Sequence, residues 1–310
     1  SAYKRFERLG SGTFGAVYRC TRRLDHKVFA VKEISLTGLL KKDVEGLRRE
    51  VTLQRKVGQH PNIVSLVEVF EENDALLVVM EYVSGGELFD RIKAFRGGMP
   101  EEEVRVIVRT LGAALSHCHR VNIVHHDLKP ENILISDATA NAAIKICDFG
   151  FASKVGVSGL LSECGTPWYV APEIIEKQPH DAGVDLWSLG VILYILLCGR
   201  PPFRDVQGDR RPLWAAIKRG LTSSHFSGEA WSGTSRGAKN VVRALLTVDP
   251  RERLNVEQLL RHPWVRGERQ RAATSLPGFD ESLRSLRAFN ERRAARADGG
   301  RAEGGVSSAV

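Results

Sequence analysis

His125-His126-Asp127-Leu128-Lys129-Pro130-Glu131-Asn132 is the stretch that decides the fold of this chain, and Asp148-Phe149-Gly150 begins sixteen positions after Asn132. The two motifs bring together two carboxylates, an amine and a carboxamide at short spacings. Phosphoryl transfer uses such groups to orient a hydroxyl, to neutralise the moving phosphate and to hold magnesium. A chance match in a turn-rich loop is a poor alternative, because four polar residues would have to coincide with an Asp-Phe-Gly at this distance.

A glycine-rich segment lies upstream, Gly10-Ser11-Gly12-Thr13-Phe14-Gly15-Ala16-Val17, and it fits the pattern G-x-G-x-x-G-x-V. Glycines in this pattern let backbone N–H groups approach and cover nucleotide phosphates. A dinucleotide-binding fold uses similar glycines but places a helix directly after them. Residues 16–20, Ala-Val-Tyr-Arg-Cys, favour a strand instead. The segment therefore predicts a β-hairpin over a nucleotide.

Two charged residues follow in a regular order. Lys32 ends the apolar run Val28-Phe29-Ala30-Val31-Lys32, which has strand character. Residues 44–58 carry apolar side chains near helical spacing, and Glu50 lies within this predicted helix. Taken alone, either charge would be interpreted as a solvated surface group. Their order after the glycine-rich segment outweighs that alternative.

Taken together, the motifs resemble those of eukaryotic protein kinases, over residues 3 to 264. The resemblance implies that Asp127 and Lys129 are the catalytic residues. It also implies ATP as the phosphoryl donor and Mg²⁺ as the cofactor, with Asn132 and Asp148 as metal ligands.

The same resemblance implies a nucleotide site between two lobes. Met80-Glu81-Tyr82-Val83 resembles the hinge whose backbone binds adenine, with Met80 as gatekeeper, and Lys32 would be positioned by an ion pair with Glu50. The implied ATP-binding residues are Gly10, Ser11, Gly12, Thr13, Phe14, Gly15, Val17, Ala30, Lys32, Glu50, Met80, Glu81, Val83, Glu87 and Glu131.

The expected fold class is α+β, a bilobal protein kinase fold with a small antiparallel β lobe that contains one helix and a larger, mainly helical lobe. Apolar runs predict strands at 3–10, 16–22, 28–34, 66–70 and 75–81. The expected organisation is an N-lobe with glycine-rich loop and hinge over residues 3–83, a C-lobe with catalytic and activation loops over 84–264, and a basic tail over 265–310.

Two helices and two buried interactions are expected in the larger lobe. The stripe from Val104 to Cys118 has helical spacing, and residues 184–198 are apolar on nearly every side. Asp185 resembles the carboxylate that braces the catalytic-loop backbone. Glu173 and Arg253 resemble a buried structural ion pair.

Two motifs resemble those of serine/threonine kinases: Lys129-Pro130-Glu131-Asn132 and Cys164-Gly165-Thr166-Pro167-Trp168-Tyr169. Two others resemble the calcium/calmodulin-dependent protein kinase group: Gly85-Gly86-Glu87-Leu88-Phe89 and Gly199-Arg200-Pro201-Pro202-Phe203. The resemblance implies substrate-binding roles for Glu87, Glu131 and Thr166. The two glutamates would face an arginine three residues before the acceptor, because paired carboxylates suit a guanidinium fork. The alternative is two solvated glutamates.

The chain departs from the family at His126, where most kinases carry an arginine that pairs with a phosphorylated activation-loop residue. An imidazole is a poor substitute for a permanent, bidentate cation. The sequence therefore predicts activity without activation-loop phosphorylation, although Ser153, Ser158 and Ser162 are expected to be available for it.

The basic tail contains Leu283, Leu286 and Phe289 on one face of a predicted helix over 281–297. It resembles the autoinhibitory segment that follows calmodulin-dependent kinase domains, and it makes calmodulin or another calcium sensor a candidate partner. The residues Ala297-Asp298-Gly299-Gly300 end this helix before a distal apolar anchor. A solvated or disordered basic tail is the alternative.

The bulk composition adds few constraints. A formal net charge of +8 could favour nucleic acid, but the basic residues are scattered and no nucleic-acid motif accompanies them, so no nucleic-acid partner is expected. The longest apolar run, Val191 to Cys198, is too short for a membrane span.

The five cysteines show no paired spacing, which favours a reduced, intracellular setting. We expect a location in the cytoplasm, with the nucleus as the second compartment. The chain begins at Ser1, so targeting signals are not judged from this end.

The leading hypothesis is a kinase that transfers the γ-phosphoryl group of ATP to serine or threonine in protein substrates. The rival is a pseudokinase scaffold that binds nucleotide or partners without turnover. Degraded motifs would support the rival, but the polar residues that the reaction needs are all present.

Overall fold

The computed structural model describes residues 2–12, 15–95, 97–137, 142–154, 167–204 and 210–268. Several features predicted above lie outside these residues: Thr13, Phe14, Ser158, Ser162, the motif residues Cys164, Gly165 and Thr166, and the tail from residue 269 on with its helix over 281–297.

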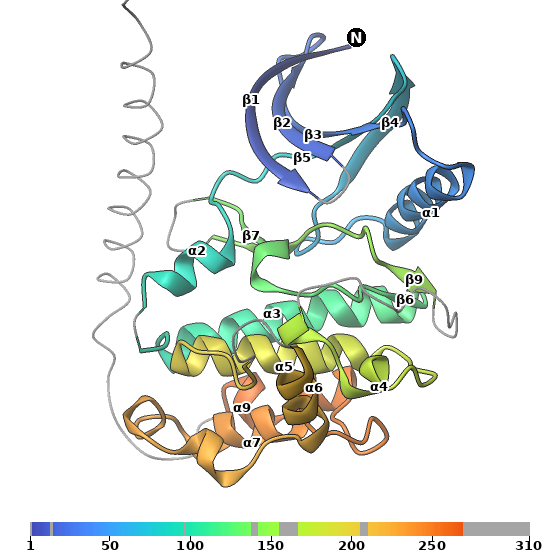
Figure 1. Cartoon of the computed structure of the whole chain (residues 1–310). Helices are drawn as coiled ribbons and strands as arrows, with labels where there is room; N and C mark the ends of the chain where they lie inside the picture. The colour runs from blue at the N-terminus through green and yellow to red at the C-terminus, as the bar shows by residue number, and fades with distance from the viewer. Residues whose placement is uncertain are drawn as a thin grey trace, which may run out of the picture.

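The N-terminal lobe is a five-stranded antiparallel sheet, at the top of Figure 1. Its strands are β1 (Tyr3–Gly12), β2 (Gly15–Arg22), β3 (Val28–Ser35), β4 (Leu66–Glu72) and β5 (Ala75–Glu81), in the spatial order β1-β2-β3-β5-β4. The β-branched and aromatic residues of the five apolar runs favour this pairing. The antiparallel sheet predicted from the sequence is confirmed.

Helix α1 (Lys41–Val57) packs on one face of this sheet (Figure 1). Its buried residues Leu47 and Val51 form a cluster with Ile34 of β3 and with Leu76 and Val78 of β5. The helix turns its arginines and lysines to solvent, so the amphipathic pattern places one face, and with it Glu50, toward the sheet.

The C-terminal lobe is mainly helical and lies below the sheet in Figure 1. Every residue of α5 (Gly183–Cys198) from Val184 onward is buried, and α3 (Glu101–Arg120) buries the predicted stripe against it. The other helices are α2 (Leu88–Lys93), α4 (Pro172–Ile175), α6 (Arg210–Arg219), α7 (Arg236–Leu245), α8 (Val256–Arg261) and α9 (Pro263–Arg266).

Two short strand pairs lie on the side of the helical lobe that faces the sheet (Figure 1). Strand β6 (Ile123–Val124) pairs with β9 (Ser153–Lys154), and β7 (Ile133–Ile135) pairs with β8 (Ile144–Ile146), all antiparallel. These four strands carry the loops that hold the polar motifs. The α+β, two-lobed fold expected from the sequence is confirmed. Among the described residues, no helix combines the length and apolar character needed to cross a bilayer.

Candidate active site

The polar residues of the catalytic loop meet at one buried carboxylate. Asp127 is 5% exposed, and its Oδ2 atom lies 2.7 Å from Lys129 Nζ. Asn132 donates from Nδ2 to the same Oδ2 at 2.9 Å and to the Asp127 main-chain oxygen at 2.8 Å. The loop thus holds a carboxylate and an ammonium group side by side, ready to accept a proton and to neutralise an incoming anion.

Asp185 of α5 fixes the backbone that leads into this loop. Its two carboxylate oxygens accept hydrogen bonds from the N–H groups of His125 and His126, each at 2.9 Å. His119 of α3 adds a contact of 2.9 Å from Nε2 to Oδ2. Burial alone would raise the pKa of Asp185, but the bond to His119 and the neighbouring imidazoles lower it to about 2. The predicted brace is therefore present as a carboxylate.

A second charged cluster joins the two lobes. Lys32 Nζ lies 3.6 Å from Glu50 Oε1 and 3.2 Å from Asp148 Oδ1, so the expected Lys32–Glu50 pair is present. Burial lowers the pKa of Lys32, yet the two carboxylates outweigh it and the net shift is upward. Burial raises the pKa of Asp148, but the Lys32 charge reverses that shift. Lys32 is therefore held as a cation, which is what anchoring a phosphate requires.

Asn132 and Asp148 lie near one end of the β7–β8 pair. The Asn132 main-chain oxygen accepts a hydrogen bond of 2.9 Å from the N–H of Cys147, the residue before Asp148. Because Asn132 uses Nδ2 for both bonds to Asp127, its carboxamide oxygen is the atom that can bind a metal. Mg²⁺ takes one or two carboxylate or carboxamide oxygens and completes its shell with phosphate and water. This donor set fits that ion.

Phe149 is packed inward beside the cluster. It is 1% exposed, and its ring centroid lies 4.9 Å from that of His125. His125 Nδ1 accepts from the Asp127 N–H at 3.3 Å, and Nε2 lies 3.1 Å from the Cys147 main-chain oxygen. His125 thus packs and orients, and both of its ring nitrogens contact the backbone.

The hinge residues continue from the end of β5. Ala30 of β3 pairs with Met80 of β5, and Lys32 of β3 pairs with Val17 of β2. These four residues therefore lie on neighbouring strands of the sheet. Met80 is half-buried, as is Val83 after the strand. The side chain of Glu81 is occupied by structural contacts.

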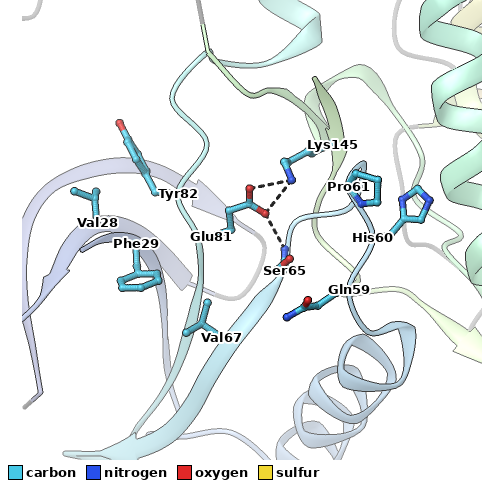
Figure 2. Close-up of a pocket in the computed structure, with 10 residues that line it drawn as sticks. All are labelled: Val28, Phe29, Gln59, His60, Pro61, Ser65, Val67, Glu81, Tyr82 and Lys145. Carbon is cyan, nitrogen blue, oxygen red and sulfur yellow. Dashed lines mark hydrogen bonds and ion pairs between the residues drawn. The ribbon is translucent and has the colours of Figure 1, made fainter. Parts of the chain in front are cut away.

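Figure 2 shows these contacts in a cavity of about 540 Å³. Glu81 Oε1 lies 2.9 Å from Lys145 Nζ of β8, and Oε2 accepts from the Ser65 N–H at 3.3 Å. This cavity is lined by neither the Lys32 cluster nor the catalytic loop, so it is separate from the candidate active site. If Glu81 contacts a nucleotide, it does so through its backbone.

Strands β1 and β2, on either side of the glycine-rich turn, pair in antiparallel register. Gly10 pairs with Val17, Ser11 with Ala16, and Gly12 with Gly15. A Cβ atom added at Gly15 would overlap the main-chain oxygen of Glu33, whereas one added at Gly10 would meet open space. The steric need for glycine is therefore at Gly15, where β2 passes close to β3.

Glu87 and Glu131 lie on neighbouring segments. Glu87 stands directly before α2 and its backbone bridges to Leu134, while Glu131 lies in a single helical turn, Pro130–Asn132, which α2 contacts. Glu131 Oε2 is buried and has no hydrogen-bond partner among the described residues. Its charge adds to burial in raising the pKa of Tyr169. A buried carboxylate oxygen without a partner is uncommon in folded proteins.

One expectation about phosphorylation is wrong. Ser153 is 7% exposed, belongs to β9, and its Oγ lies 2.7 Å from His126 Nε2. A hydroxyl buried in a strand pair and bonded to an imidazole is not accessible to a modifying enzyme. Its position in the sequence, five residues after Asp148, gave no sign of this contact.

Two contacting residues were not singled out from the sequence: His119, which holds Asp185, and Lys145, which holds Glu81. Ser153 was singled out only for phosphorylation, and its contact with His126 was not expected. Each partner is between 27 and 66 positions away along the chain, so no local pattern indicates the pairing.

Comparisons with known proteins agree with this geometry. The family described as protein kinase domain matches residues 3–265. Calcium-dependent protein kinase 20 of Oryza sativa subsp. japonica is 41% identical over 265 residues, which cover 83% of this chain and 46% of that protein. The calcium/calmodulin-dependent protein kinase type II alpha chain of Drosophila melanogaster is 38% identical over 289 residues, covering 93% and 53%. Serine/threonine-protein kinase DCLK3 of Mus musculus is 42% identical over 258 residues, covering 83% and 32%. The chain spans about half the length of most of the curated relatives it matches.

Proposed function

The chain belongs to the protein kinase family, and on that premise we propose that it transfers the γ-phosphoryl group of ATP to serine or threonine residues of protein substrates. The observation that carries this proposal is the meeting of Lys129 Nζ and Asp127 Oδ2 at 2.7 Å beside Asn132. Such an arrangement accepts a hydroxyl proton and compensates the charge of the moving phosphoryl group.

Each residue has one task in this mechanism. Asp127 orients the acceptor hydroxyl and takes its proton, while Lys129 neutralises the negative charge of the phosphoryl group during transfer. Lys32, held by Glu50, anchors the nucleotide phosphates. Mg²⁺ supplies charge neutralisation at the phosphate oxygens when Asn132 and Asp148 hold it. Catalysis is then mainly positioning and electrostatic stabilisation.

The test is phosphate transfer from Mg-ATP to a serine peptide, with an Asp127→Asn variant beside the wild type. We expect turnover in the wild type and a loss of about a thousandfold in the variant, as for removal of other catalytic groups. ATP binding by both proteins, with turnover by neither, would support the pseudokinase alternative. The variant removes one negative charge without removing volume, so ATP affinity serves as the control for folding.

We further propose a preference for arginine three residues before the acceptor. The support is the buried, unpartnered Oε2 of Glu131 beside α2, whose first turn follows Glu87. Replacing that arginine by alanine in the peptide, or Glu131 by Gln, should raise KM by about tenfold or more, since hydrogen bonds to charged groups contribute about 1.5–3 kcal/mol. Glu257→Gln, an exposed glutamate of α8, is the matched control. Equal rates with either peptide would contradict the preference.

Independence from activation-loop phosphorylation is also proposed, because an imidazole replaces the usual arginine at His126. Unphosphorylated wild type and a Ser158→Ala, Ser162→Ala double variant should have the same kcat. A large gain in rate on stoichiometric phosphorylation, lost in the double variant, would contradict it.

The tail and the location stay proposals. We propose that residues 281–297 inhibit the domain and respond to calmodulin or another calcium sensor, supported by the arginine-rich, amphipathic sequence. A chain ending at residue 269 should then be more active than the full chain, and only the full chain should respond to Ca²⁺ and calmodulin. An intracellular location, in the cytoplasm or the nucleus, remains the prediction drawn from the cysteines.

A further inference from the structure

We propose that His126 and Ser153 form a latch, the hydrogen bond between His126 Nε2 and Ser153 Oγ, that ties β9 to the catalytic loop without a phosphate and thereby positions Asp148. The two atoms lie 2.7 Å apart, and Ser153 is buried. The role in catalysis rests on the proposed kinase function, while the latch itself is a property of the fold.

The strand pair that the latch closes is short over the residues that the structure describes. There, β6 and β9 contribute two residues each, with the pairs Ile123–Lys154 and Val124–Ser153. Isolated pairs of strands are marginal even at greater length. The side-chain bond from His126, two residues beyond β6, therefore adds a third connection where the backbone ladder ends.

His126 is held in position for this contact. Its N–H donates to Asp185 Oδ1 at 2.9 Å, and its φ of 64° lies in the left-handed region. Residues other than glycine seldom adopt this backbone conformation, so the surrounding structure must stabilise it. The ring also packs edge-on against His180, with centroids 5.3 Å apart. The imidazole thus has little freedom to turn away from Ser153.

The chain between Ser153 and Asp148 is short and turned. The Ala152 N–H donates to the Phe149 main-chain oxygen at 2.9 Å, so the residues directly before β9 form a tight turn. Phe149 is itself buried beside His125. A displacement of β9 is therefore transmitted to Asp148, whose carboxylate lies 3.2 Å from Lys32 Nζ.

The latch needs no anion. Two cationic side chains at positions 126 and 153 would repel each other unless a phosphate lay between them. The imidazole of His126 and the hydroxyl of Ser153 instead bond directly to each other. Burial lowers the pKa of His126, which keeps the ring neutral at neutral pH. The contact is therefore complete whatever the phosphorylation state of the residues that follow β9.

Four variants separate the latch from backbone strain and from general destabilisation. Ser153→Ala and His126→Asn remove the bond, and asparagine tolerates the left-handed backbone well. His126→Gln keeps a polar nitrogen near the position of Nε2 but is less suited to that backbone. Lys154→Ala, at an exposed position of the same strand, is the matched control.

The latch predicts a specific ranking of kcat, measured at a temperature where all proteins are folded. Ser153→Ala and His126→Asn should each lower kcat by about tenfold, with little change in KM for the peptide, as expected for small displacements of catalytic groups. His126→Gln and Lys154→Ala should stay close to the wild type. The double variant Ser153→Ala, His126→Asn should be no slower than the slower single variant, because both remove one bond. Wild-type kcat in both single variants, or a fast His126→Asn with a slow His126→Gln, would overturn the proposal.

Hydrogen exchange of the β6 and β9 amides tests the latch without relying on activity. Exchange at these amides should be faster in Ser153→Ala than in Lys154→Ala, while α3 and α5 stay protected as in the wild type. Faster exchange in Ser153→Ala, combined with an inactive wild type, would keep the latch and reject the kinase proposal. Unchanged exchange in Ser153→Ala would reject the latch, whatever the activity.

Discussion

Arg253 and Glu173 form a bidentate ion pair in the interior of the helical lobe, although eighty positions separate them in the chain. The Nη1 and Nη2 atoms lie 2.6 and 2.8 Å from the two carboxylate oxygens, and the side chains are 1% and 2% exposed. The guanidinium also donates to the main-chain oxygens of Thr247, Val248 and Gly183. The pair thus connects α4, the start of α5 and the loop after α7.

Removing one partner of this pair should strand a buried charge. We expect Arg253→Met to lower the free energy of unfolding by about 3–5 kcal/mol, measured by urea denaturation. Arg251→Met is the control, because its side chain is 87% exposed and its pair with Asp249 should contribute little to stability. A double variant, Arg253→Met with Glu173→Leu, should lose less than the sum of the two single changes. Equal losses for the two arginine variants would contradict the expectation.

Glu50, the largely buried partner of Lys32, should matter far more for catalysis than an exposed ion pair between α1 and β4. Glu50→Gln removes the charge that holds Lys32 and should lower kcat/KM for ATP by about a hundredfold, a typical effect of disturbing a preorganised site. Glu71→Gln breaks the pair with Arg48, whose side chains are 60% and 46% exposed, and should have little effect. Steady-state kinetics at varied ATP concentration measure both. Similar losses in the two variants would show that burial does not decide the effect.

The two outer glycines of the glycine-rich segment should respond differently to alanine. Gly15→Ala forces a Cβ atom into the Glu33 carbonyl, so β2 must move away from β3 and the thermal midpoint should fall. Gly10→Ala places its Cβ in open space and should leave the midpoint nearly unchanged in the absence of nucleotide. Thermal unfolding of the two variants provides the comparison. A larger loss at Gly10 would contradict the packing argument.

Stability should fall with decreasing pH because of His60. Burial, and then the neighbouring charges of His117, Arg120 and Lys145, lower its pKa below the ordinary value of 6.5, and its Nδ1 accepts from the Asn62 N–H at 3.1 Å. Below pH about 6.5 the unfolded chain takes up a proton at this residue that the folded chain does not yet take up. The unfolded state then binds more protons, so the free energy of unfolding falls as the pH falls.

A His60→Gln variant tests this pH dependence. It should show a shallower decline of the thermal midpoint between pH about 7 and about 5.5, because glutamine takes up no proton in either state. Thermal unfolding at several pH values, compared with the wild type, measures the slope. An identical slope in both proteins would assign the decline to other groups.

Local patterns in the sequence predicted much of the fold. The stripe from Val104 to Cys118 is the face of α3 that packs into the core of the helical lobe. The apolar run of residues 184–198 is the buried helix α5. The first prediction succeeds because burial follows the period of an amphipathic helix, and the second because a helix that is apolar on all sides is buried on all sides. The pair Lys32–Glu50 and the brace at Asp185 were also expected, but from the family resemblance and not from periodicity.

The error at Ser153 has a different origin. A serine near a loop is interpreted as accessible when only its neighbours in the chain are known. Its burial depends on β6, about thirty positions upstream, and on an imidazole at His126 that turns toward it. The unpartnered Oε2 of Glu131 is equally invisible in the sequence, because an unsatisfied atom is defined by what surrounds it.

The sequence by itself determined the chemical groups and their order: a glycine-rich hairpin, a lysine, a glutamate, and the polar motifs around Asp127 and Asp148. Spacing and side-chain type suffice for these, since they depend on the local geometry of strands, helices and turns. Only the tertiary structure decided which distant groups pair, as Glu81 does with Lys145 and His126 with Ser153. Such pairs form because burial makes an unmatched polar atom costly, and burial is known only once the whole chain is folded.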